Sequence, residues 1–148
     1  MSLLGRIFVI FFAFLVASLA AGIAIAIGLL GSDWPALQGD PVGRSGFWVV
    51  VLFGSSFAGA VGILPLFLLI VLAESFRLRS VLLYAVAGVV ILLLGFYGLG
   101  FGVEESIDQV GPISPDAELA AAAGVVFGFV YWAIAGRNAG KWAETARP

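Results

Sequence analysis

The polar turn Glu74-Ser-Phe-Arg-Leu-Arg-Ser80 carries the carboxylate whose position most invites chemistry. Glu74 directly follows a long apolar run, and a carboxylate buried inside a helix bundle could take up a proton or a cation. Arg77 stands three residues later, close enough on a helix to form an ion pair with Glu74 instead. Exposed pairs of this kind are common and contribute only about 0–1 kcal/mol. Because Glu74 lies at the edge of the apolar run and not within it, we favour the ion pair.

The segment Gly136-Arg-Asn-Ala-Gly140-Lys141 has glycines and a lysine in the order of a phosphate-binding loop. Its glycines are one residue too close together for that motif, and Trp142 stands where the motif has a serine or threonine. No strand is predicted before it. We interpret the segment as a basic, aromatic exit from a membrane, and nothing else in the sequence favours nucleic-acid binding.

The residue types that most often catalyse reactions or hold metals are missing from the sequence. The chain has no cysteine and no histidine. Disulfides and thiolate sites are therefore excluded, and the usual ligand of haem and the commonest proton carrier near neutral pH are missing as well. Ser55 and Ser56 have no base beside them and can donate to the carbonyl groups four residues earlier. We expect no enzyme activity, no cofactor and no metal site.

The composition indicates where these residues lie. Hydrophobic residues make up 62% of the 148 residues and charged residues 11%, with a mean hydropathy of +1.16. Soluble domains have about 45–50% apolar and about 25% charged residues. We therefore predict a single integral membrane domain over residues 1–148, whose function must reside in the spans or in short loops.

Four apolar segments are long enough to cross a bilayer as helices, which requires about 20 residues each. They cover residues 7–30, 47–73, 81–101 and 115–136. The predicted fold is an all-α bundle of four transmembrane helices. Ser114-Pro115-Asp116 has the residues of a helix start, with serine as the cap and proline in the first turn. The first segment could instead be a signal peptide cleaved near Ala20, although its apolar run continues past that point.

Small residues recur at every fourth position on the second and fourth segments, where they would let another helix backbone approach closely. These positions are Gly54, Ala58, Gly62, Ala120, Gly124 and Gly128. The small-residue face on each of the two segments could pack against another helix of the same chain or against another copy in an oligomer. Pro65 lacks an amide hydrogen and predicts a kink in the second segment. Tyr84, Tyr97 and Tyr131 are expected near the membrane interfaces, where aromatic residues are enriched.

Basic residues concentrate on one side of the predicted membrane. Arg44 lies in a loop on the other side, whereas six basic residues share the first side: Arg6, Arg77, Arg79, Arg137, Lys141 and Arg147. Since basic loops remain in the cytoplasm, both termini are predicted to be cytoplasmic. Of the six residues on the cytoplasmic side, we expect all except Arg147 to contact anionic lipid headgroups. The preference for arginine over lysine, with abundant alanine, glycine and valine, is typical of a GC-rich bacterial genome and indicates a bacterial inner membrane.

Two segments carry a resemblance to known proteins. Ile63-Leu-Pro65 followed by Leu72-Ala-Glu-Ser-Phe-Arg-Leu-Arg-Ser80, together with Val130-Tyr-Trp-Ala-Ile-Ala-Gly-Arg-Asn-Ala-Gly140, resembles small four-span inner-membrane proteins of alphaproteobacteria. The resemblance implies the same topology over most of the chain. It implies no activity, cofactor or catalytic residue.

The absence of titratable groups from the apolar cores favours a non-enzymatic protein. We expect an accessory or assembly partner of a larger membrane complex, in contact with membrane lipid and with a protein partner or further copies of itself. The alternative is a small oligomeric channel or carrier that uses the Pro65 kink, Ser55 and Ser56 to line a path. An enzyme that acts on lipid through loop carboxylates is a third hypothesis.

Replacing Arg77 and Arg79 together by glutamate should weaken the orientation signal, because these arginines form the basic turn between the second and third segments. A topology reporter fused after residue 79 measures the effect, and we expect part of it to cross the membrane. A reporter that stays fully cytoplasmic in this variant contradicts the account of orientation.

Overall fold

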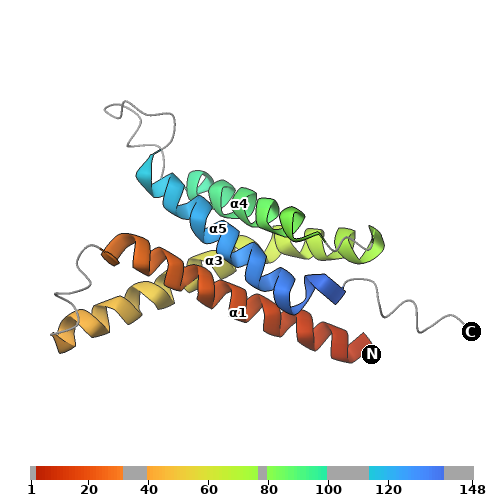
Figure 1. The fold of residues 1–148 in the computed structure, drawn as a ribbon, viewed down its shortest axis with the longest axis horizontal. Coiled ribbons are helices and arrows are strands. Elements are labelled where there is room, and N and C mark those ends of the chain that lie inside the picture. The colour runs from red at the N-terminus through yellow and green to blue at the C-terminus, as the bar shows by residue number, and fades with distance from the viewer. Residues whose placement is uncertain (1–2, 32–39, 77–79, 100–113, 139–148) are drawn as a thin grey trace, which may run out of the picture.

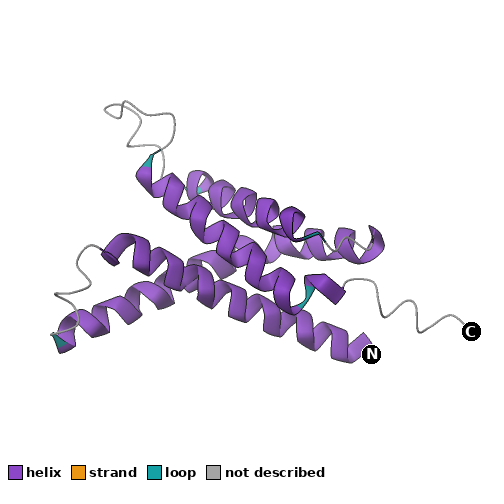
Figure 2. Ribbon diagram, viewed as in Figure 1, coloured by secondary structure: helices purple, strands orange, loops and turns teal. Residues whose placement is uncertain are grey.

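A computed structural model describes residues 3–31, 40–76, 80–99 and 114–138 (Figure 1). All regular structure in these ranges is helical (Figure 2). The elements are α1 (Leu3–Leu30), α3 (Pro41–Phe76), α4 (Val81–Gly98), α5 (Pro115–Ile134) and the short 3-10 helix η3 (Gly136–Asn138). In the described ranges, each of the four α-helices is long and apolar enough to cross a membrane. The predicted all-helical class with four spans is confirmed, and the side of the membrane on which the termini lie stays a prediction.

Capping residues set the starts of two helices. Ser114 caps α5 by accepting a hydrogen bond from the amide of Ala117 at 3.2 Å, as its sequence context predicts. The Asp40 carboxylate caps α3, since its oxygens accept from the amides of Val42 at 3.1 Å and Gly43 at 3.2 Å. The second span was expected to begin at residue 47, because the residues up to 46 were interpreted as a loop. The helix begins earlier because the aspartate and the following proline form the same kind of start as in α5.

Helix α3 runs without a break past Pro65, with 36 residues in all. At about 1.5 Å per residue it is longer than the roughly 30 Å hydrocarbon core, so part of α3 extends beyond it unless the helix tilts strongly. The hydroxyls of Ser55 and Ser56 donate to carbonyl groups one turn earlier at 2.6 and 2.8 Å, which confirms the predicted bonding within the helix. A bend at Pro65 stays a prediction.

The four α-helices are held together by unequal contacts. Helix α4 packs extensively on α5, and α1 packs on both α3 and α5, whereas α3 and α4 share a much smaller contact. Figure 1 shows α3 crossing the bundle obliquely behind α1 and α5. The core is made mostly of alanines with a few larger side chains, among them Ala13, Ala17, Ala21, Leu92 and Phe127. Helix α3 is therefore the least enclosed of the four.

Helices α4 and α5 meet backbone to backbone at glycines. A methyl group on Gly128 would meet the carbonyl group of Tyr84 and would lie 2.9 Å from the Cα of Ala85. A methyl group on Gly124 would lie 2.6 Å from the carbonyl oxygen of Gly88. Such distances are too short for real carbon atoms, so this crossing requires residues without side chains.

Helices α1 and α3 meet in a similar way. A methyl group on Gly22 would meet the carbonyl oxygen of Val51 and the side chain of Ser55, and a methyl group on Gly54 would lie 3.2 Å from the Cα of Gly22. Both stripes of small residues singled out in the sequence are buried inside this single chain: Gly54, Ala58, Gly62, Ala120, Gly124 and Gly128. Gly22 and Gly88 face these stripes from the neighbouring helices and were not predicted from the sequence.

Replacing Gly128 by alanine should destabilise the bundle by about 1–3 kcal/mol, because the added methyl group must push α4 and α5 apart. Gly46→Ala is a matched control, since a methyl group there meets nothing within 4 Å. Alanine is also favoured over glycine in a helix by about 1 kcal/mol. Unfolding in mixed micelles, followed by circular dichroism, measures both variants. Equal stabilities for the two variants would contradict the proposed crossing.

Candidate functional site

The basic end of the bundle, defined by Arg6 and Arg137, holds a buried arginine. Arg6 on α1 is 7% exposed, and its Nη2 donates to the carbonyl oxygen of Ala135 at 2.9 Å. Ala135 is the C-terminal cap of α5. The last carbonyl groups of a helix lack partners within the helix and carry partial negative charge, so a guanidinium group suits this position. Arg6 therefore links the beginning of α1 to the end of α5.

The basic residues predicted to contact lipid headgroups differ in their surroundings. The structure places Arg6 inside the bundle and not at the surface expected from the sequence, because the end of α5 supplies its hydrogen-bond acceptor. Arg137 in η3 is exposed. Arg77, Arg79 and Lys141 lie outside the described residues, as does the side chain of Glu74. The Glu74–Arg77 ion pair therefore stays a prediction.

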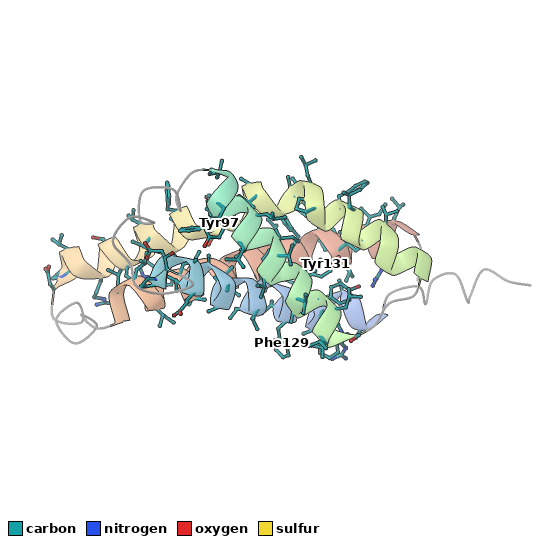
Figure 3. All side chains as sticks on the ribbon, turned by 90° about the horizontal axis from the view of Figure 1, so that it is seen from above. Tyr97, Phe129 and Tyr131 are labelled. Atoms are coloured by element: carbon teal, nitrogen blue, oxygen red, sulfur yellow. The ribbon has the colours of Figure 1, made fainter. Side chains whose placement is uncertain are left out.

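Two tyrosines are buried near Arg137 and η3. The rings of Tyr84 on α4 and Tyr131 on α5 are 2% and 3% exposed, with centroids 5.8 Å apart. A methyl group on Gly136 would lie 2.9 Å from the Tyr84 ring, so the chain leaves α5 directly against this pair. These rings pack inside the bundle near the ends of their helices, and their depth near a membrane interface stays a prediction. Tyr97, near the other end of α4, is half exposed (Figure 3).

A hollow that we call the α1–α3 groove runs between these two helices in the half nearer the basic end. It has a volume of about 360 Å³. Among the residues that line it are Ile7, Phe11 and Phe14 from α1 and Ile63, Phe67 and Ile70 from α3. All of its described lining side chains are apolar. The described lining can therefore hold an apolar body of defined shape.

A second hollow, the acidic-end groove, lies at the opposite end of the bundle, which carries Asp40, Asp116 and Glu118. Its volume is about 250 Å³, and all four α-helices contribute to it. The lining includes Leu29 from α1, Phe53 and Phe57 from α3, Phe96 from α4, and Asp116 and Leu119 from α5. Asp116 is the one charged residue among its described lining residues. This groove joins an apolar surface to a carboxylate, which the α1–α3 groove does not.

Ser18 on α1 is a buried polar residue two positions before Ala20, where the sequence offered a possible signal-peptide cleavage site. It is 6% exposed, and its Oγ has no hydrogen-bond partner among the described residues. It faces α3, where a Cβ on Gly59 would lie 3.5 Å from this oxygen. The hydroxyl is thus enclosed at the α1–α3 contact and does not line either groove.

Within the part of the chain that the structure describes, no three acidic side chains come together in a way that could hold a metal ion. Comparison with protein-family models, curated proteins and solved structures finds no match to this chain. The class of this protein is therefore argued from its fold alone. Four apolar helices of spanning length place it among multi-pass helical membrane proteins.

Replacing Arg6 by glutamine should destabilise the bundle by about 1.5–3 kcal/mol, because a hydrogen bond from a charged donor to the end of α5 is lost. Arg44→Gln is the control, since Arg44 is exposed on the first turn of α3. Thermal unfolding of both variants in the same detergent measures the difference. If the two substitutions have the same small effect, Arg6 does not hold α1 to α5.

Proposed function

We propose that this protein is a non-catalytic partner within a larger membrane complex, and that the α1–α3 groove is where a transmembrane helix of that complex docks. The observation that carries the proposal is the shape and exposure of this groove. The expectation of no catalysis rests on the sequence, which lacks cysteine and histidine.

The groove lies in a broad exposed apolar surface. Leu64 and Phe67 on α3 are 77% and 64% exposed, and Phe11 on α1 is more than half exposed. Lipid tails can cover a convex helix surface. A concave channel between two helices is instead the place where the side-chain ridge of a third helix packs most closely.

Packing of this kind is what distinguishes protein from lipid inside a membrane. Lipid tails are as apolar as leucine, so helices associate there through van der Waals contact and shape, not through the hydrophobic effect. Phe11, Phe14 and Phe67 give the groove large, stiff walls. A partner helix that fits these walls gains contacts that mobile acyl chains do not maintain.

The small-residue stripes give less support to an oligomer, because neighbouring helices of the same chain bury them. The alternative, an oligomeric channel or carrier, also has less support. The hydroxyls of Ser55 and Ser56, which would line its path, donate to carbonyl groups within α3.

Affinity purification of a tagged protein from native membranes in mild detergent, followed by mass spectrometry, tests the proposal. We expect a stoichiometric membrane-protein partner with the wild type and its loss from Phe11→Ala/Phe67→Ala, because both rings form the groove. Phe129→Ala is the matched control and should retain the partner. Phe129 is also about half exposed, but it projects from α5 on the side away from α3 (Figure 3).

Two results would contradict the proposal. One is recovery of the wild-type protein alone, either as a monomer or as a defined oligomer. The other is a partner that remains bound to the groove variant as strongly as to the Phe129 control.

A further inference from the structure

We propose that the acidic-end groove binds one phospholipid whose headgroup carries an ammonium group, with an acyl chain in the groove and the ammonium paired with Asp116. This site is separate from the α1–α3 groove and does not depend on the proposed partner. It is also independent of the basic residues, for which headgroup contact was expected from the sequence.

The groove exists because α3 separates from the rest of the bundle at this end. Helices α3 and α4 share only a small contact, and the first half of α3 runs away from the start of α5 (Figure 1). Residues of α1 lie between them, so the hollow is enclosed by protein on several sides. Its volume of about 250 Å³ suits a segment of an acyl chain and is small for a whole lipid.

The walls favour an aliphatic chain. Phe53, Phe57 and Phe96 bring aromatic rings from two helices, and Leu29 and Leu119 complete the apolar lining. The lining also includes Gly54, where α3 packs closely on Gly22 and Ile25 of α1 and so closes one side of the groove. A flexible chain can follow such an irregular surface.

Asp116 selects the headgroup. It is exposed, lies on the first turn of α5 and lines the groove, while the uncharged part of α5 begins at Leu119. Because the carboxylate stands one turn before the apolar part of α5, we infer that it lies at the depth where lipid headgroups begin. Glu118 adds a second exposed negative charge on the same turn. Arg44, the described basic residue at this end, does not line the groove. An ammonium group is therefore attracted to the rim of the groove, and an anionic headgroup is repelled from it.

The apolar hollow and the Asp116 carboxylate together distinguish a lipid from other occupants. An apolar hollow alone would accept a partner side chain, and a carboxylate on a first helical turn alone would serve only to stabilise the helix. A carboxylate that forms part of the wall of an apolar hollow at headgroup depth matches a ligand with a cation directly above an apolar chain.

Native mass spectrometry of the detergent-purified full chain tests this proposal. The protein is titrated with phosphatidylethanolamine or phosphatidylglycerol that carry identical acyl chains, and the retained lipid is counted. We expect phosphatidylethanolamine to be retained about two- to fivefold more strongly, the range that one exposed ion pair can supply. Asp116→Asn should abolish this preference, and Asp116→Glu should keep it.

Two further variants separate the contribution of the apolar hollow to lipid binding from that of the surface charge. Leu29→Trp, at a half-exposed position in the groove, should reduce the retention of both lipids because the indole ring fills the hollow. Glu118→Gln removes an exposed carboxylate on the same turn that does not line the groove, and it should leave most of the preference. Circular dichroism establishes that each variant is folded.

Several outcomes would overturn the proposal. These are equal retention of the two lipids by the wild type, a preference that persists in Asp116→Asn, or an equal loss of preference in Glu118→Gln, which would indicate surface charge alone. An alkylammonium detergent that binds in an Asp116-dependent manner while phosphatidylethanolamine does not bind would also overturn it, since the ligand would then be a free amphiphilic amine.

Discussion

Close contact between helix backbones at glycines is the interaction on which the rest of this structure depends. In a membrane the hydrophobic effect does not drive helices together, so the stability of the bundle comes from van der Waals packing and a few polar contacts. At one crossing α4 and α5 touch through Gly88, Gly124 and Gly128, and at another α1 and α3 touch through Gly22. Because these contacts leave no room for side chains, the larger apolar residues are displaced toward the outside of the bundle.

The remaining features follow from the way these helix pairs are joined. Helix α1 packs on both α3 and α5, and the buried hydrogen bond from Arg6 to Ala135 fixes its beginning at the end of α5. Helix α3 is held mainly by α1, so hollows remain beside it toward either end of the bundle. The hollow nearer the basic end is wholly apolar, whereas the other includes Asp116 in its lining. This difference is the physical reason to propose a protein partner for one groove and a lipid for the other.

The features that could be predicted from the sequence are those encoded by neighbouring residues. Apolar runs predict the spans, Ser114 and Pro115 predict the start of α5, and Ser55 bonds within its own helix. The start of α3 at Asp40 was missed although it has the same residue signature, because the glycines and prolines around it were interpreted as a loop. The burial of Arg6 could not be predicted, since it depends on which helix ends meet. The residues that face the small-residue stripes depend likewise on the register between helices. Several glycines of the chain could have faced these stripes equally well, so Gly22 and Gly88 could not be singled out.

Helices α1 and α3 pack on each other within one chain, and a cysteine cross-link tests this packing directly. The chain has no native cysteine. A Cβ on Gly59 would lie 4.0 Å from the Cβ of Ser18, within the range of about 3.5–4.5 Å that a disulfide requires. Ser18→Cys/Gly59→Cys, oxidised in native membranes, should therefore form a disulfide within the monomer. A failure to form it, or a disulfide between two copies of the chain, would contradict the arrangement of α1 and α3 on which both grooves depend.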